Sequence, residues 1–248
     1  MTKTLRLLFL FLFLFLLLGA AGLRAEPLRL AGDVWPPFTD ARLPGNGLAV
    51  QLVEAALQRA GYTTKYFEVP WARVLQGVQV GDYDVVVSAW YKDDRVVYGL
   101  YSEPYLVNRI RFVQRRGAGL HYTKLDDLLP YSLAVVRGYA YFPGFDQDAR
   151  LKRLSVVGFE MGARMVAAGR VNLTLEDELV ARYHFGRGLK GIRDELEFLP
   201  QPLSENNLAI LVRRSLPQHR EVVERFNRAL QEMREDGTYQ RILDAQGL

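Results

Sequence analysis

Cysteine is absent from the 248 residues of this chain. Its absence excludes disulfide bonds, thiolate catalysis, and zinc or iron–sulfur sites with cysteine ligands. Histidine is scarce as well: the chain has three, at His121, His184 and His219, with no spacing typical of a metal site. We therefore expect neither a metal nor a cofactor.

The chain has little excess charge and no dense basic run. Lys and Arg together number 32, against 28 Asp and Glu. Three of the cations (Lys3, Arg6 and Arg24) lie in an N-terminal segment that we expect to be removed, and the remaining 29 nearly balance the acids. A nucleic-acid-binding surface needs a basic patch or stripe, so that class of function is not expected.

Long hydrophobic runs are also lacking, except at the N-terminus. Two basic residues precede the apolar run Leu7–Leu18, and four small residues follow it. This order is typical of a secretory signal, and we place the cleavage after Ala25. The alternative is a permanent membrane anchor. A spanning helix needs about 20 apolar residues, and the run reaches that length only if the glycines and Arg24 are counted. We expect a signal peptide at 1–25 and a soluble periplasmic product.

The rest of the chain alternates strand-like and helix-like segments. The segment Asp84–Ser88 is apolar enough for a strand buried on both faces. In Leu48–Ala60, apolar residues recur at helical spacing and Gly61 ends the pattern. This alternation predicts parallel sheets with helical crossovers. The other strands expected are Leu28–Ala31, Lys65–Val69, Arg109–Gln114, Ser132–Val136, Val171–Leu175 and Leu208–Val212, and the other main helices are 70–80, Glu160–Ala168, 178–183 and Pro217–Glu235.

Six short motifs in a fixed order resemble one known family. The strand Leu28–Gly32 is followed by the loop Trp35–Phe38, and Arg95 lies nine residues before Pro104 of a Ser-Glu-Pro-Tyr motif. The remaining motifs are Gly81–Asp84, Leu125–Leu128 with Leu133–Gly138, Gly169–Asp177 and Asp236–Tyr239. Together, over about 220 residues, they resemble the family 3 periplasmic solute-binding proteins, which serve amino-acid ABC importers.

The resemblance implies a type II periplasmic-binding-protein fold. This is an α/β fold with two lobes, each a mainly parallel sheet flanked by helices, and a ligand cleft between them. The first lobe would contain residues 26–112 and 206–248, and the second 113–205. Ligands bind at the carboxyl ends of strands in such sheets, where the motifs lie. We expect a small-molecule ligand, such as an amino acid or organic acid, a possible ABC permease partner at the inner membrane, and a monomer.

Two charged residues are the main candidates for holding such a ligand. The resemblance implies that Arg95 holds the ligand carboxylate, and a guanidinium fork matches a carboxylate in two places. The alternative is a solvated partner for Asp93 or Asp94. Asp177 aligns with the acid that takes the ligand ammonium, its alternative being a helix N-cap. Glu176 and Glu178 are rival acids.

Aromatic residues follow the expected strand ends and are candidates for the walls of the cleft. Trp35 and Phe38 lie in a proline loop, and Trp90 and Tyr91 follow Ser88 at the end of the third strand. They would stack on a flat or cationic ligand, and the alternative is packing between loop and sheet. Trp71 and Arg73 are weaker candidates at a helix start. Tyr139 stands where the family usually has a threonine that bonds the ligand carboxylate. The candidate ligand-binding residues are Arg95, Asp177, Trp35, Phe38, Ser88, Trp90, Tyr91 and Tyr139.

Two other function classes remain open. The same fold resembles periplasmic cyclohexadienyl dehydratases, in which Glu176, Asp177, Glu178 or Glu103 would serve as the general acid. The fold also resembles the input domains of membrane kinases, and this chain would then act as a detached sensor. No catalytic triad stands out in the sequence, so we expect a binding protein rather than an enzyme.

Overall fold

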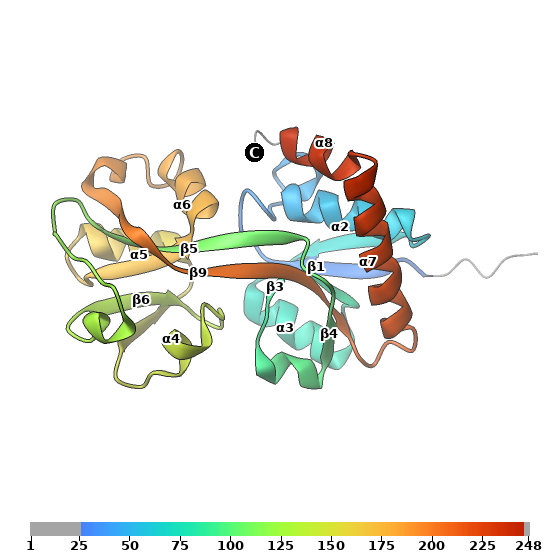
Figure 1. The fold of residues 1–248 in the computed structure, drawn as a ribbon, viewed down its shortest axis with the longest axis horizontal. Helices are drawn as coiled ribbons and strands as arrows, with labels where there is room; N and C mark the ends of the chain where they lie inside the picture. Colours follow the sequence, from blue (N-terminus) through green and yellow to red (C-terminus); the bar gives the residue numbers. More distant parts are fainter. Residues whose placement is uncertain (1–25, 246–248) are drawn as a thin grey trace, which may run out of the picture.

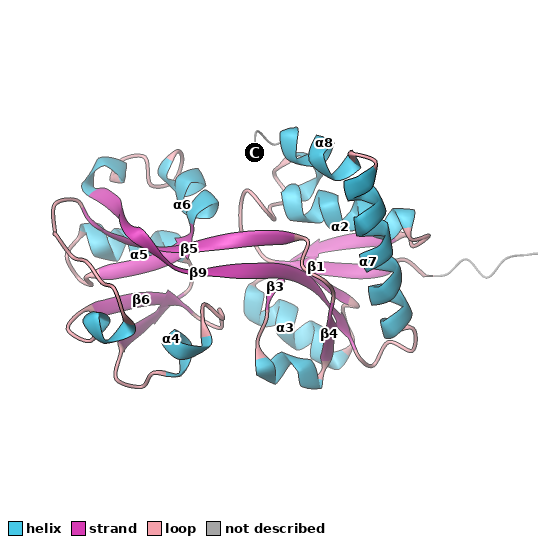
Figure 2. Cartoon of the chain, viewed as in Figure 1, coloured by secondary structure: helices cyan, strands magenta, loops and turns pink. Residues whose placement is uncertain are grey.

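The molecule is built around one mixed sheet that runs through two lobes (Figure 1). The structure, a computed structural model, describes residues 26–245, so the expected signal peptide lies outside the described residues. In this part of the chain, nine strands pair in the order β2-β1-β3-β9-β5-β8-β6-β7, and β4 pairs with β9. Figure 2 shows the sheet continuing from one lobe to the other, with helices around it. The strands are β1 (Leu28–Gly32), β2 (Thr64–Glu68), β3 (Val85–Trp90), β4 (Gly99–Tyr101), β5 (Leu106–Arg115), β6 (Ser132–Val136), β7 (Lys152–Val156), β8 (Leu173–Asp177) and β9 (Leu196–Arg213).

The helices lie on both sides of the sheet. The α-helices are α2 (Leu48–Arg59), α3 (Trp71–Val80), α4 (Pro143–Gln147), α5 (Phe159–Ala167), α6 (Glu178–Phe185), α7 (His219–Glu235) and α8 (Thr238–Asp244). Short 3-10 turns add η1 (Pro44–Asn46), η2 (Asp93–Val97), η3 (Leu125–Leu128) and η4 (Arg193–Glu195). None of the helices between residues 26 and 245 has the length and hydropathy to span a bilayer.

The first lobe packs its apolar residues around β1 and β3. These strands are parallel, as predicted, and every residue of β3 is buried. In Figure 1, α2, α7 and α8 lie on one side of these strands and α3 on the other. Helix α7 buries one stripe, including Val222, Phe226 and Met233, at the spacing of an amphipathic helix. The lobe is therefore a sheet covered on both faces.

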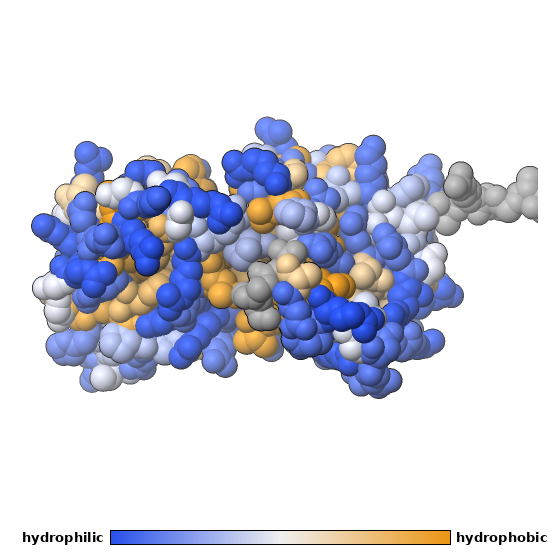
Figure 3. Space-filling model, turned by 90° about the horizontal axis from the view of Figure 1, so that it is seen from above, coloured by the Kyte–Doolittle hydropathy of each residue, from blue (hydrophilic) through white to orange (hydrophobic). Residues whose placement is uncertain are grey.

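The second lobe has the same kind of core. Strand β6 pairs in parallel with β7 and β8, and β8 is buried throughout. Helices α5 and α6 pack against β8. Seen from above, the surface of the molecule is mainly hydrophilic, with apolar patches interspersed (Figure 3).

Two long antiparallel strands join the lobes, and both extend beyond their predicted bounds. Strand β5 covers 10 residues and β9 covers 18, far more than the expected Leu208–Val212. They pair from Leu106 opposite Leu208 to Arg115 opposite Leu196 (Figure 1). The added part of β9 mixes apolar with polar residues, is mostly exposed or half-buried, and contains two prolines, so it lacks the continuous buried run that marks a strand in the sequence. These two strands connect the lobes, so that the cleft lies between them.

Candidate functional site

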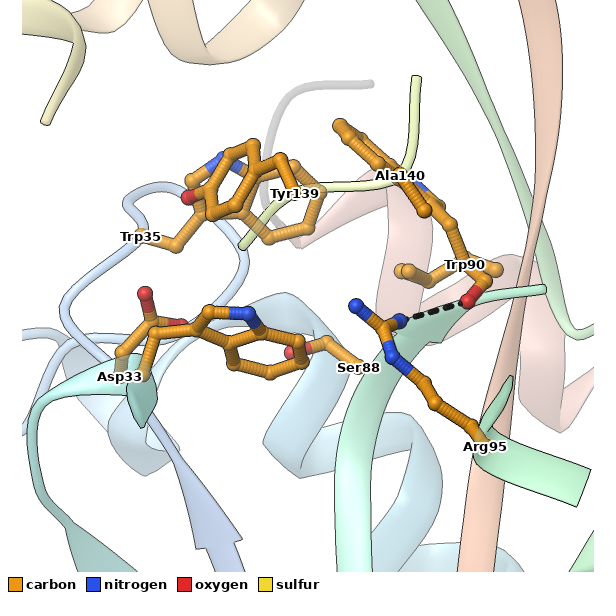
Figure 4. Close-up of a pocket in the computed structure, with 9 residues that line it drawn as sticks. Asp33, Trp35, Ser88, Trp90, Arg95, Tyr139 and Ala140 are labelled. Carbon is orange, nitrogen blue, oxygen red and sulfur yellow. Dashed lines mark hydrogen bonds between the residues drawn. The ribbon is translucent and has the colours of Figure 1, made fainter. Parts of the chain in front are cut away.

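A small cavity lies between the lobes, where several strands end (Figure 4). Its volume is about 20 Å³, which is room for about one water molecule. Asp33 directly follows β1, while Ser88 and Trp90 belong to the last part of β3. The carboxyl ends of strands are where ligands bind in such sheets. The residues lining the cavity are Asp33, Trp35, Trp71, Ser88, Trp90, Arg95, Tyr139, Ala140 and Leu208.

Arg95 is part of this cavity wall rather than a solvated partner of its acidic neighbours. Its side chain comes from η2 and the residue is only 2% exposed. The guanidinium donates from Nη1 to the carbonyl oxygen of Trp90 and from Nη2 to that of Gly138, both at 2.9 Å. It also lies over the ring of Trp71, 5.2 Å from its centroid. These two bonds, both to neutral carbonyl oxygens, use two of its five N–H donors.

Ser88 has a polar atom with no partner in the wall of the same cavity. The residue is 5% exposed, and its Oγ makes no hydrogen bond within the described part of the chain. A buried hydroxyl without a partner carries a desolvation cost. A polar ligand atom in the cavity would remove that cost.

Trp35 and Trp90 form aromatic walls, and each indole N–H is bound. Trp35 donates from Nε1 to Oε1 of Glu176 at 3.2 Å, and Trp90 donates to Oδ1 of Asn108 at 2.8 Å. Their rings meet edge to face, with 5.5 Å between centroids. Phe38 packs against Trp35 at 4.6 Å behind this wall, and it is not among the residues that line the cavity. These bonds fix the orientation of both indoles.

Trp71, a weaker candidate in the sequence, lies in the cavity wall, whereas Tyr91 lies outside it. Trp71 donates from Nε1 to the carbonyl oxygen of Gly138 at 3.2 Å. Tyr91 is 58% exposed and packs on Tyr101, with 5.3 Å between ring centroids. Its ring therefore borders a larger, open groove.

Two acids face the cleft from opposite lobes. Asp33 lines the small cavity, and burial raises the pKa of its carboxyl to about 7. Glu176, near the end of β8, is 1% exposed, and burial raises its pKa to about 8 although the backbone N–H of Asp177 donates to it. In Figure 4, the Asp33 carboxylate and the Arg95 guanidinium approach the cavity from opposite sides. Sequence reasoning did not single out Asp33, although its place directly after a strand was a usable signal.

Asp177 uses its carboxylate within the fold. Its Oδ1 accepts from the backbone N–H groups of Leu179 (2.9 Å) and Val180 (3.1 Å), as a helix N-cap. Its Oδ2 accepts from Nδ2 of Asn108 and the backbone N–H of Arg109, both at 3.1 Å. The structure shows the N-cap that the sequence left as the alternative. Glu178, another rival acid, binds Arg111 and Arg182.

Two larger cavities adjoin the small one. One, of about 780 Å³, lies between the Asp33–Trp35 segment and helices α5 and α6. The other, of about 1160 Å³, lies between η2 and α4. Tyr139 lines all three, and Asp177 lines none of them. No group of three or more His, Cys, Asp or Glu side chains in residues 26–245 is arranged to hold a metal ion.

The chain is similar to known binding proteins in sequence and in fold. It is 28% identical over 204 residues to the L-cystine-binding protein TcyA of Bacillus subtilis (strain 168), covering 79% of this chain and 70% of that protein. Its fold is similar to a histidine kinase sensor domain with similarity to periplasmic binding proteins (TM-score 0.76, 19% identity, 90% of this chain and 96% of that chain). A mutant of ArgBP from T. maritima is also similar (TM-score 0.73, 20% identity, 88% and 93%).

A family model covers almost the whole described chain. The model for bacterial extracellular solute-binding proteins, family 3, matches residues 28–245. The two lobes, the mixed sheet and the crossing strands agree with the type II periplasmic-binding-protein fold of the structural relatives. The chain belongs to the bacterial extracellular solute-binding proteins, family 3.

Proposed function

We propose that this protein captures a small zwitterion, an amino acid or a related amino carboxylate, between its lobes for delivery to an ABC importer. One observation carries the proposal: Arg95 and Asp33 approach the same cavity from opposite sides, between aromatic walls. A guanidinium binds a carboxylate through paired hydrogen bonds, and a carboxylate binds an ammonium group. The distribution of charge therefore complements a ligand with both groups.

The unpartnered hydroxyl of Ser88 supports the same ligand class. It lies in the cavity wall with Arg95, where a ligand carboxylate oxygen would accept its hydrogen bond. The names of the relatives are consistent with this class, because they include proteins that bind cystine and arginine.

Delivery to an importer requires export and a change between open and closed forms. The N-terminal run Leu7–Leu18 supports export to the periplasm. For closure, we expect 26–112 with 206–248 and 113–205 to move as two bodies about β5 and β9. The bonds from Arg95 to Gly138 and from Trp35 to Glu176 join the two lobes in this form. A ligand that bridges both lobes would favour this form by its difference in affinity for the two states.

A thermal-shift screen of amino acids, polyamines and organic acids tests the proposal. A ligand at 100 times its Kd raises the free energy of unfolding by about 2.7 kcal/mol. We expect hits among amino carboxylates, and no hits among polyamines, which lack a group for Arg95. Calorimetry on each hit then gives the affinity. Binding restricted to molecules without a carboxylate would contradict the proposal.

The geometry also favours a second function, a dehydratase-like enzyme. A buried carboxylic acid whose pKa is about 8, at Glu176, is protonated at neutral pH and is able to act as a general acid. Incubation of the mature protein with prephenate or arogenate, followed by chromatography, tests this alternative. Turnover that is lost in Glu176→Gln would support the enzyme. Unchanged substrate would exclude this alternative and favour a binding protein.

A further inference from the structure

The cavity between Arg95 and Asp33 is too small for any amino acid as it stands. Its volume of about 20 Å³ compares with about 300–1000 Å³ for ordinary ligand sites. The two neighbouring cavities are large, and Tyr139 is the one described residue that borders all three. The ring of Tyr139 therefore separates the charged centre of the cleft from the open space on either side.

The other walls of the cavity are held by hydrogen bonds. Trp35 and Trp90 each donate from the indole to a buried acceptor, and Arg95 donates to two carbonyl oxygens. The phenol of Tyr139, in contrast, makes no hydrogen bond to any residue between 26 and 245, and the residue is only partly buried. Of these side chains, Tyr139 is the one that loses no side-chain hydrogen bond when it moves, although its ring also contacts Tyr141, with 5.8 Å between centroids.

Aromatic edges hold the Tyr139 ring in place. It meets Trp90 at 5.4 Å and Trp71 at 6.3 Å between centroids, each at an interplanar angle of 82°. Next to it, the carbonyl oxygen of Gly138 accepts from Arg95 and from Trp71. The φ angle of Gly138 is +80°, a conformation that suits glycine. The Gly138–Tyr139 segment thus offers the cleft an acceptor for the guanidinium and a ring for the two indoles.

We propose that Tyr139 is a plug that occupies the place of the ligand side chain, and that the ligand which displaces it is an amino acid with an aromatic ring. The inference rests on the proposed function and adds the class of side chain. The ligand carboxylate takes the place of the Gly138 carbonyl on Arg95, and its ring restores the edge-to-face contacts with Trp71 and Trp90. The displaced phenol turns into one of the two large cavities. An aliphatic side chain fills the same volume without restoring those contacts.

Two probes of similar shape and equal charge, L-phenylalanine and L-cyclohexylalanine, test the ring requirement by calorimetry. Edge-to-face pairs contribute about 2- to 12-fold in affinity each, so we expect L-phenylalanine to bind at least about fivefold more tightly. All three tryptophans of the chain, Trp35, Trp71 and Trp90, line the cavity, so intrinsic fluorescence gives an independent binding signal. Equal affinities for the two probes would overturn the aromatic assignment.

Variants of Tyr139 test the plug itself. Tyr139→Ala removes the ring that the ligand has to displace, so L-phenylalanine should bind about tenfold more tightly. Tyr139→Phe keeps the ring and should leave the affinity within about twofold, because the hydroxyl has no hydrogen bond to lose. Tyr139→Leu, for the case in which the alanine variant unfolds, should give an intermediate gain. Tyr183→Ala, which removes a ring outside all three cavities, is the matched control.

Weaker or unchanged binding of L-phenylalanine in both Tyr139→Ala and Tyr139→Leu would show that Tyr139 is a wall and not a plug. The failure of this inference differs from that of the proposed function. In one outcome, neither L-phenylalanine nor L-cyclohexylalanine binds any variant, while L-glutamine or L-leucine binds the wild type and not Arg95→Ala. The plug and the aromatic ligand class are then wrong, and the proposed function stands. If no amino acid binds the folded protein, the proposed function fails and this inference fails with it.

Discussion

The guanidinium of Arg95, from the lobe that contains β3, donates a 2.9 Å hydrogen bond to the carbonyl oxygen of Gly138, two residues after β6 in the other lobe. This bond joins the two lobes at the centre of the cleft. The acceptor is a backbone carbonyl, and a ligand carboxylate is a stronger acceptor because it is ionised. A bound carboxylate would therefore replace a neutral contact between the lobes with a charged one.

Replacing Arg95 should remove carboxylate binding without unfolding the protein. Breaking a buried charge pair costs about 3–5 kcal/mol, or about two to three and a half decades in Kd. Arg95→Ala should therefore abolish measurable binding by calorimetry, and Arg95→Lys should restore only part, because the charge returns without the fork. Arg228→Ala, on the exposed side of α7, is the control. Binding by Arg95→Ala within a few-fold of wild type would exclude this role.

Ser88→Ala should separate ligand binding from stability. The buried Oγ has no partner among the described residues, so its removal should leave the free energy of unfolding unchanged or slightly higher. Loss of the hydrogen bond to the ligand should weaken binding by about 0.5–1.5 kcal/mol, or about 2- to 12-fold. Thermal unfolding and calorimetry on the same samples measure the two effects. A large loss of stability together with unchanged affinity would contradict a ligand contact.

Asp177→Asn should lower stability more than it changes ligand preference. Asparagine caps a helix as well as aspartate does, so Oδ1 keeps its role. The new amide N–H₂, however, would face the two donors of Asn108 and Arg109 that now bind Oδ2. Leaving buried donors unpaired costs about 1–3 kcal/mol, which denaturant unfolding will measure. The sequence alone predicted a selective loss of ligands that carry an ammonium group. If Asp177→Asn selectively lost ligands with an ammonium group and kept its stability, Asp177 would be the ammonium-binding acid after all.

Stability should fall as the pH rises from about 6.5 to about 8. Burial raises the pKa of Glu176 from 4.5 to about 8 and that of Asp33 from 3.8 to about 7, so the folded state keeps protons that the unfolded state has released. The free energy of unfolding decreases with pH wherever the folded state binds more protons. Burial lowers the pKa of His184 below 6.5, which acts in the opposite direction only below that pH. Urea unfolding across the window measures the slope.

Glu176→Gln should reduce this slope to the part that Asp33 contributes, because the group that titrates near pH 8 is gone. Glu178→Gln, two residues further along the chain, is the matched control. Partial burial acts to raise the pKa of Glu178, but hydrogen bonds from Arg182 and Arg111 lower it overall, so it titrates below 4.5 and outside the window. The control should keep the wild-type slope. A wild-type slope in Glu176→Gln would mean that Glu176 is ionised throughout.

The sequence predicted the buried strands and the family because both depend on local patterns. The run that became β3 is apolar at nearly every position, and the stripe on α7 repeats at helical spacing. The first half of β9 escaped prediction because its neighbours are in β5, far along the chain, and its apolar residues are interrupted by two prolines and by polar residues. The short helix α8 also lacks a buried residue that would mark it.

The sequence identified several residues of the candidate site, but it did not show which way each side chain points. Five of the eight candidates chosen from the sequence line one cavity in the structure (Arg95, Ser88, Trp35, Trp90 and Tyr139), and Phe38, Tyr91 and Asp177 do not. Neighbouring residues of a strand point to opposite faces, so the choice between Glu176 and Asp177 depended on the phase of β8. That phase is set by pairing with β5 and β6, which no local pattern reveals.

The most direct test of the account is a calorimetric comparison of the best amino acid from the screen with its carboxamide. The two molecules differ only in the charged group that Arg95 is proposed to hold. The account predicts that the amide binds at least about 100-fold more weakly, since the buried guanidinium would lose its ionic partner. An amide that binds within a few-fold of the parent amino acid would contradict the central claim that Arg95 and Asp33 together hold a zwitterion.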